Sequence, residues 1–394
     1  MNMKAIKIFT IYFILLLVCS CQRKEPSDVV LIFLDEVEVY SEVYLSNLIT
    51  FSNVQLAQDF KLALDRVGQN EYIVNYIYNN KEYQRDIVVD VVDKVSPFIF
   101  SGGNRTIILG SKPDFCNSLI YGDNYDKEPI CEVVGEYDTS NIGTYYPKLK
   151  ITDSSGNTTE KDLTIEVVSK IESSNENKEE IIEFAKVKEK YQKEGISLGI
   201  DVSSWQETVD YNEVKKAGAE FVIIRLGFQS SSTRELKIDS FYEENIKNAR
   251  DAGLKVGVYL YTTASSANEA RMQAEWVLNI LNKQHLDLPI VFDWEDFSYF
   301  RKSNFSLYEF NKMADIFIKT VHDAGYQGML YSSKIYLENF WENKNDYPVW
   351  LAHYTDETSY QGNYLIWQMG NTGQIAGING NVDINIMYEG GKNG

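Results

Sequence analysis

From Ser197 onward, short apolar or β-branched runs alternate with stretches whose apolar residues lie three and four positions apart. The first pattern predicts strands and the second predicts amphipathic helices. Such alternation favours a parallel β/α barrel, here a TIM-like barrel over residues 196–390. Late connections such as 355–364 are too short for full helices, so we expect the last third to be irregular. The expected strands are 198–202, 221–226, 255–261, 288–293, 329–332, 349–353, 365–369 and 382–387, and the expected helices are 240–252, 267–283 and 306–324.

Acidic residues stand at or just beyond the ends of several expected strands: Asp201, Asp293, Glu295 and Asp383. The C-terminal strand ends of a β/α barrel form the face on which active sites are built. In an extended strand, Asp293 and Glu295 share one face, about 6.5–7 Å apart. Glycoside hydrolysis uses such a carboxyl pair, and crowding of acids raises the pKa of one member. We therefore expect Glu295 to donate the proton; the alternative is that these acids cap helices or pair with arginine.

The motifs that carry these acids resemble those of glycoside hydrolase family 25, over about residues 195–388. These enzymes are lysozymes that cut the β-1,4 bond between N-acetylmuramic acid and N-acetylglucosamine in peptidoglycan. The resemblance implies that Glu295 is the proton donor and Asp293 its partner, with Asp201 and Asp383 as further site acids. Asp293 would either orient a 2-acetamido group or bind water in an inverting route. The motifs are GIDVSSWQ at 199–206, FDWE at 292–295, WLAHY at 350–354, WQ at 367–368 and VDIN at 382–385.

The same resemblance implies a sugar-binding groove lined by aromatic residues and one glutamine. The sequence differs from that of many family members at Arg225-Leu226-Gly227 and at Tyr259-Leu260-Tyr261. These differences bear on which sugars the subsites prefer, whereas the catalytic acids are unchanged. No cluster with zinc-like spacing and no phosphate-binding glycine motif is present in the sequence, so neither a metal nor a cofactor is expected. The expected groove residues are Tyr259, Tyr261, Trp350, Tyr354, Trp367 and Gln368.

Residues 28–170 consist of short strand-like runs separated by turn signals. An internal repeat with an offset of about 75 residues places Gly68 opposite Gly143 and Lys94 opposite Lys170. We therefore expect two small all-β modules, at 28–95 and 96–170, and the second resembles bacterial immunoglobulin-like repeats. Such modules are spacers or adhesion domains. The whole chain is thus expected to be multidomain, with the β/α barrel preceded by two immunoglobulin-like modules.

Between the second module and the barrel, residues 171–195 are rich in Glu, Lys, Asn and Ser. This composition predicts a charged linker that leads into a solvated helix at about 178–193. Within the second module, Cys116 and Cys131 are expected to form a disulfide across a short loop in an exported protein, worth about 3 kcal/mol. The alternative is metal binding, which is less favoured because no His lies near them.

The first 20 residues have the layout of a secretory signal peptide, with Lys4 and Lys7 before an apolar run over 8–18. That run is shorter than the ~20 residues of a permanent membrane helix. The following Cys19-Ser20-Cys21 resembles a bacterial lipobox, so we expect acylation of Cys21 and a lipid-anchored tether at 21–27. The alternative is an ordinary secreted product.

The chain carries 38 basic and 57 acidic residues, a net charge of −19. Cleavage of the signal peptide removes two lysines, leaving 36 basic residues and a net charge of −21. This balance excludes a general nucleic-acid binder and gives no attraction to anionic lipid. We therefore expect a cell-surface, extracytoplasmic lipoprotein whose partners are peptidoglycan strands and, through its lipid, the membrane. The alternatives are a wall-binding barrel without turnover and an adhesin whose β modules bind a protein.

Overall fold

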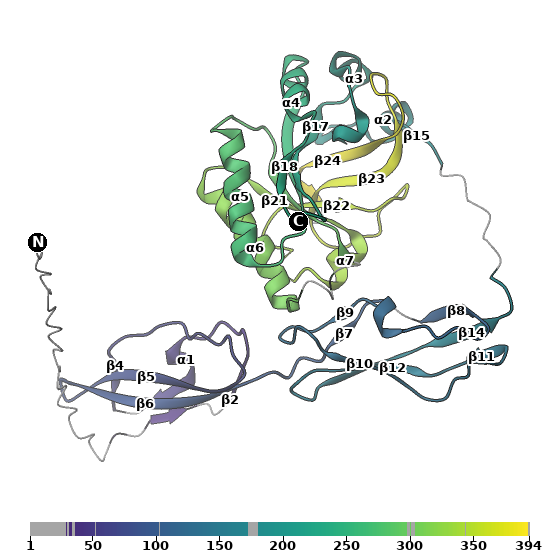
Figure 1. The fold of residues 1–394 in the computed structure, drawn as a ribbon. Helices are drawn as coiled ribbons and strands as arrows, with labels where there is room; N and C mark the ends of the chain where they lie inside the picture. The colour runs from purple at the N-terminus through teal and green to yellow at the C-terminus, as the bar shows by residue number, and fades with distance from the viewer. Residues whose placement is uncertain are drawn as a thin grey trace, which may run out of the picture. The chain divides into compact units, whose positions relative to one another are not determined.

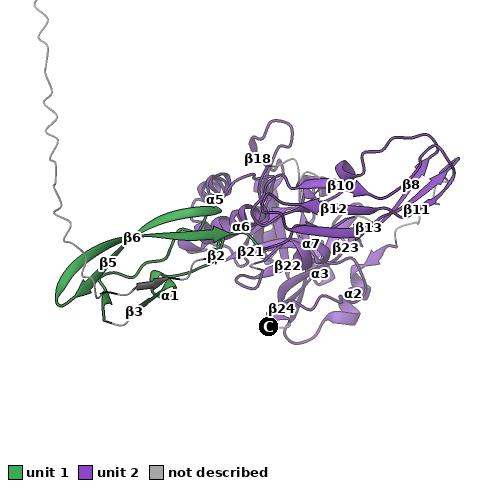
Figure 2. Ribbon diagram, turned by 90° about the horizontal axis from the view of Figure 1, so that it is seen from below, with its two compact units in different colours: residues 1–94 green, residues 95–394 purple. Residues whose placement is uncertain are grey.

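A computed structural model describes residues 29, 31–33, 36–51, 53–101, 103–171, 180–297, 300, 304–342 and 344–392. The expected signal peptide (1–20), the acylation site Cys21 and the tether (21–27) lie outside these residues. Among the described residues, no helix has the length and hydropathy needed to cross a membrane. The chain divides into two compact units, residues 1–94 and 95–394 (Figure 2).

The described part of the first unit is built around a long hairpin. Strands β5 (Gly68–Tyr78) and β6 (Lys81–Val92) pair along their length, joined by Asn79 and Asn80 with φ of 48° and 58°. Positive φ at both central residues is the conformation of a type I′ turn, which matches the twist of the two strands. The remaining elements are β1 (Leu31–Phe33), β2 (Glu36–Glu38), α1 (Leu45–Leu48), β3 (Ile49–Phe51) and β4 (Gln55–Leu56).

The second unit begins with a small all-β region at 95–170. Two three-stranded sheets, β10-β12-β13 and β11-β14-β8, enclose a core that includes Leu149, Ile151 and Ile165. Its immunoglobulin-like class stays a prediction. The elements are β7 (Phe98–Ile99), β8 (Asn104–Ile108), η1 (Cys116–Ser118), β9 (Tyr121–Gly122), β10 (Ile130–Val134), β11 (Gly143–Tyr145), β12 (Lys148–Thr152), β13 (Thr158–Asp162) and β14 (Thr164–Val168).

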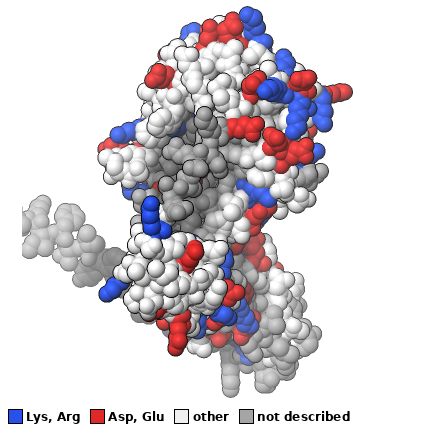
Figure 3. All heavy atoms as spheres, turned by 90° about the vertical axis from the view of Figure 1, so that its right-hand side faces the viewer, with Lys and Arg blue, Asp and Glu red and all other residues white. Residues whose placement is uncertain are grey.

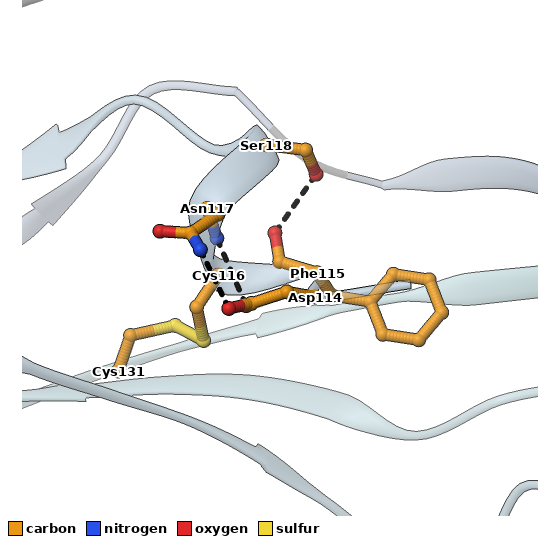
Figure 4. Close-up of a disulfide and its surroundings, with 6 residues drawn as sticks. All are labelled: Asp114, Phe115, Cys116, Asn117, Ser118 and Cys131. Carbon is orange, nitrogen blue, oxygen red and sulfur yellow. Dashed lines mark hydrogen bonds between the residues drawn. A yellow bond between two sulfur atoms is a disulfide. The ribbon is translucent and has the colours of Figure 1, made fainter. Parts of the chain in front are cut away.

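A disulfide joins Cys116 to Cys131 and so ties η1 to β10 (Figure 4). The Cα atoms of the two cysteines are 5.9 Å apart. Beside the bridge, the Asp114 carboxylate accepts hydrogen bonds from the backbone and side-chain nitrogens of Asn117, at 3.1 and 2.7 Å. The two cysteines that were expected to pair are therefore bonded to each other.

The remainder of the second unit is a closed barrel of eight strands (Figure 1). All eight expected strands are present, and seven of them are parallel. The prediction of a parallel barrel is wrong for the last strand, β24, which lies in the part expected to be irregular and runs antiparallel to both β23 and β16. The short connection 375–381 cannot carry the chain back across the barrel, so β24 returns beside β23. The strands are β16 (Ile196–Val202), β17 (Phe221–Gln229), β19 (Lys255–Thr262), β20 (Ile290–Trp294), β21 (Gly328–Ser333), β22 (Val349–Ala352), β23 (Tyr364–Gln374) and β24 (Val382–Lys392).

Helices cover the outside of the barrel, and the three expected helices are present as α4, α5 and α6. Ser266 and Ser306 cap α5 and α6, since each side chain accepts a hydrogen bond from the backbone nitrogen three residues later. The helices are α3 (Tyr211–Ala217), α4 (Tyr242–Asp251), α5 (Ala267–Leu281), α6 (Leu307–Asp323) and α7 (Lys334–Asn339), with the 3-10 turn η2 (Ser204–Gln206) and the added strand β18 (Leu236–Ile238).

The end of the expected linker is part of the barrel rather than a solvated helix. Strand β15 (Ile182–Glu183) pairs with β23, and helix α2 (Phe184–Tyr191) is shorter than expected. Phe184 and Val187 are 2% and 5% exposed, because these apolar residues on one helix face pack into the barrel core. Residues 172–179 of this segment lie outside the described residues.

Candidate active site

Asp201 points into the barrel from the end of β16. Its neighbours Ile200 and Val202 pack outward against the helices, and successive side chains of a strand alternate between the two faces. The strand lies very close to β17 at Gly199, where a Cβ atom would stand 2.5 Å from the carbonyl oxygen of Phe221. Glycine is therefore required two residues before the aspartate.

Asp293 and Glu295 lie at the end of β20. Val291 belongs to the inner core of the barrel, whereas Phe292 and Trp294 pack in the layer beneath the helices. Asp293 follows Val291 by two positions, so its side chain points to the same inner face of the barrel, and it is 5% exposed. The ladder of β20 ends at Trp294, so Glu295 is the first residue beyond it.

Asp383 reaches the same rim because β24 is antiparallel. It is the second residue of β24, and in the register of the sheet it lies opposite Asp201. In a parallel strand, a residue at the start would lie at the opposite end of the barrel. The reversal of the last strand therefore completes the group of four acids.

A cavity of about 420 Å³ brings these acids together with most of the expected groove residues. Tyr259, Tyr261, Trp350, Tyr354 and Gln368 line it as expected. The other lining residues are Ser203, Trp205, Gln206, Arg225 and Tyr331.

The prediction that Trp367 lines the groove is wrong. This tryptophan is 1% exposed, and its ring meets Tyr191 of α2 edge to face at 5.8 Å. Its indole nitrogen donates to the carbonyl oxygen of His353 at 2.8 Å. Because Gln368 points into the barrel, the preceding side chain on the strand must point outward.

Two side-chain amides hold Asp201. The Oδ2 atom of Asp201 accepts hydrogen bonds from Gln368 Nε2 at 2.9 Å and from Asn385 Nδ2 at 2.8 Å. Trp350 Nε1 in turn donates to Asn385 Oδ1 at 2.8 Å, and Tyr331 Oη donates to Gln368 Oε1, also at 2.8 Å. These bonds orient both amides with their N–H groups toward the carboxylate. Trp350, only 2% exposed, thus positions Asn385 and offers little surface for stacking.

The electrostatics of the cavity favour protonated carboxyl groups. Burial raises the pKa of Asp201 to about 6, and the two amide bonds oppose this rise. Burial, with the added charge of Asp201, raises the pKa of Glu295 to about 7 and that of Asp383 to about 9. Burial also raises the pKa of Asp293 well above its usual value.

Crowding of the acids was expected to raise the pKa of one of them, but burial is the larger cause and it raises the pKa of all four acids. Near neutral pH, Asp201 is therefore the favoured anion and Glu295 is poised to give up a proton.

Sequence reasoning assigned no role to several residues of this site. Asn385 stands two residues after Asp383, and the period of a strand could have placed it on the same face. Trp205 is 84% exposed at the edge of the cavity. Arg225 pairs with the buried Asp239 at 2.7 Å, and it is the one Lys or Arg among the described residues that line the cavity.

Comparison with known proteins gives matches to the barrel. Residues 200–378 match the family described as Glycosyl hydrolases family 25. The uncharacterized protein YegX of Escherichia coli O157:H7 is 31% identical over 193 residues, which are 48% of this chain and 68% of that protein. An autolytic lysozyme of Clostridium acetobutylicum is 29% identical over 200 residues, 49% of this chain and 56% of the lysozyme.

Solved structures include similar chains. The modular autolysin LytC from Streptococcus pneumoniae, in complex with a synthetic peptidoglycan ligand, is 23% identical with a TM-score of 0.44, over 61% of this chain and 56% of that chain. A family 25 glycosyl hydrolase from Bacillus anthracis is 20% identical with a TM-score of 0.42, over 50% of this chain and 92% of that chain. This chain thus matches little more than half the length of the autolysin and of the autolytic lysozyme.

Proposed function

This chain belongs to glycosyl hydrolase family 25, and we propose that it hydrolyses the β-1,4 bond between N-acetylmuramic acid and N-acetylglucosamine in peptidoglycan. The observation that carries the proposal is the cavity at the barrel rim, where Glu295 shares a buried site with three aspartates. A general acid works best with a pKa near the working pH, and burial raises the pKa of Glu295 to about 7.

In the proposed reaction, Glu295 protonates the oxygen of the leaving sugar as the glycosidic bond breaks. Positive charge then develops at the anomeric carbon. The Asp201 carboxylate, whose negative charge is held by Gln368 and Asn385, stabilises that charge. Asp293 is the partner carboxyl: it orients a 2-acetamido group for internal attack, or it binds the attacking water in an inverting route. In the internal route, water adds to the anomeric carbon in a second step and gives its proton to the Glu295 carboxylate. In the inverting route, the attacking water gives its proton to Asp293, which must then be ionised in the productive form.

The aromatic residues around the acids are proposed to hold the sugars. Tyr259, Tyr261, Tyr354 and the exposed Trp205 offer ring faces on which the apolar faces of sugars can stack. On the face of the molecule drawn in Figure 3, acidic and basic side chains are intermixed and do not form separate acidic and basic patches. Recognition of the anionic wall would accordingly depend on the local chemistry of the groove.

The location of the protein is also part of the proposal. A lipid on Cys21 would hold the mature chain at the outer surface of the membrane, where peptidoglycan is within reach. The support is the lipobox-like sequence after the apolar run.

The test is release of reducing sugar ends from purified peptidoglycan, followed by mass spectrometry of the fragments. We expect fragments with muramic acid at the reducing end, and a loss of at least 100-fold in rate for Glu295→Gln. Glu275→Gln, an exposed glutamate on α5, is the matched control and should retain full activity. Undiminished release by Glu295→Gln, or none by the wild type, would refute the proposal, and binding to intact sacculi without cleavage would favour a wall-binding barrel.

A further inference from the structure

The all-β region at 95–170 completes the cap of a barrel helix. The first backbone amides of a helix have no acceptor within the helix itself. In α6, the amide nitrogen of Leu307 donates to the carbonyl oxygen of Asp123 at 2.8 Å, and that of Tyr308 donates to the carbonyl oxygen of Asn124 at 3.3 Å. Lys127 pairs with Glu309 of the same helix turn at 2.8 Å. The start of α6 is therefore bonded to the β region as well as to its own Ser306.

Aromatic packing extends this contact toward the barrel rim. The ring of Phe98, on β7, lies 5.0 Å from Phe340 and 6.2 Å from Phe300, edge to face in both cases. Gly122, on the paired strand β9, leaves room for this contact, since a Cβ atom there would stand 2.9 Å from Phe300 and 3.0 Å from Phe98. The β region thus presents a closely fitted apolar surface to the barrel.

The same aromatic cluster reaches the backbone of Glu295. Phe297 stacks on Tyr336 with ring centroids 3.5 Å apart, and its ring lies 5.0 Å from Phe340. The amide nitrogen of Phe297 donates to the carbonyl oxygen of Glu295 at 2.7 Å. Because Glu295 lies beyond the last paired residue of β20, its placement depends on the packing of the residues that follow it.

We propose that residues 96–170 are a positioning domain for Glu295, acting through Phe98 and the cluster formed by Phe297, Phe300, Tyr336 and Phe340. This goes beyond a spacer between membrane and enzyme, and it rests on the proposed function because Glu295 must be the proton donor. Phe98 is a positioning residue, since it contacts the cluster and not the substrate. A displacement of about 1 Å in a reacting group can lower a rate about 100-fold.

The test compares Phe98→Ala in the full chain with wild type on purified peptidoglycan. We expect kcat to fall at least tenfold while KM changes less than twofold, because the substitution leaves the groove intact. We also expect the alkaline limb of the kcat/KM profile to move to lower pH. A loosened Glu295 becomes more hydrated, its raised pKa falls, and the protonated form is lost earlier as pH rises. The titratable groups that face Glu295 are unchanged in this variant: Asp201, Tyr261, Asp293, Tyr331, Tyr336, Tyr354 and Asp383.

Control variants separate positioning from stability. Tyr146→Ala removes a 77% exposed ring from the same β region and should leave kcat and the pH profile unchanged. Phe98→Leu keeps an apolar side chain at the interface and should recover most of the activity. Gly122→Ala places a methyl group against Phe98 and Phe300 from β9, so it should also lower kcat. If Phe98→Ala does not fold, Gly122→Ala tests the positioning role in its place.

The inference is overturned if a folded Phe98→Ala or Gly122→Ala keeps kcat within twofold and the same alkaline limb, even at a lower unfolding temperature. Inactivity of the wild type is a different outcome, because it would refute the proposed function. A wild type that is active, with variants equally active, would refute the positioning role alone.

Discussion

Replacing Asn385 by leucine removes one of the two amide hydrogen bonds that Asp201 accepts, at 2.8 Å, and keeps a side chain of similar size. A hydrogen bond to a charged group is worth about 1.5–3 kcal/mol, which corresponds to about one to two pKa units. Loss of a donor destabilises the carboxylate, so the pKa of Asp201 should rise from about 6 to about 7–8.

This shift has a defined effect on the pH profile. In the proposed reaction, the productive form carries an ionised Asp201 and a protonated Glu295, whose pKa values burial raises to about 6 and about 7 in the wild type. The optimum should therefore lie near pH ~6.5 and move up by about 0.5–1 pH unit in Asn385→Leu. The productive fraction at the optimum should also fall, because fewer molecules combine an ionised Asp201 with a protonated Glu295.

The assay is the initial rate of reducing-end release from peptidoglycan between pH 4 and 9. Asn385→Leu also leaves the indole N–H of Trp350 without its acceptor, so Trp350→Phe serves as the control. Trp350→Phe removes that donor, keeps the amide of Asn385, and should shift the acid limb less. An acid limb in Asn385→Leu that stays within 0.2 pH units of wild type would refute the role of Asp201 as the ionised group.

Further measurements test other parts of the molecule. Because burial raises the pKa of Asp383 to about 9, the unfolded chain loses this proton near pH ~4 while the fold keeps it, so the fold loses stability as pH rises from about 4 through 9. Asp383→Asn should therefore raise the unfolding free energy by about 1–2 kcal/mol at pH 8 and lower activity, as followed by thermal melts and reducing-end release; equal stability at pH 4 and 8 in the wild type would contradict this. Replacing both Cys116 and Cys131 by serine opens a link between residues 15 apart and should cost about 3 kcal/mol in urea unfolding, while an unchanged midpoint would speak against it. Trp205→Ala should raise KM severalfold at similar kcat if the ring stacks on a sugar, and an unaltered KM would exclude that. Cys21→Ala should move the protein from the membrane fraction to the medium and abolish labelling by radioactive palmitate, and persistent labelling would rule out this acylation site.

The sequence predicted the elements of the barrel well because their signals are local. The runs that contain Asp201 and Asp293 are strongly apolar, and the periodicity of α6 and its Ser306 cap lie within a few residues of each other. The two-residue spacing of Asp293 and Glu295 predicted that both lie on one face, and both line the cavity although β20 ends at Trp294. The motif around these acids supplied the resemblance that the family match supports.

Tertiary structure decided the features that depend on residues far apart in the chain. The place of Asp383 opposite Asp201 follows from the pairing of β24 with β16, which closes the barrel. The outward orientation of Trp367 and the burial of Phe184 depend on how β23 and α2 pack together. A sequence pattern lists residues in order, whereas these outcomes depend on contacts between segments that lie up to about 190 residues apart, such as β16 and β24.

The chemistry of the site divides in the same way. The sequence by itself determined which acids are available, that Glu295 follows a strand end, and that Cys116 and Cys131 are close in the chain. Only the tertiary structure decided that Asp201 is held by amides from β23 and β24 and that burial raises the pKa of every acid in the cavity. The reason is physical: a pKa depends on solvent exclusion and on the neighbours in space, and both are set when the barrel closes.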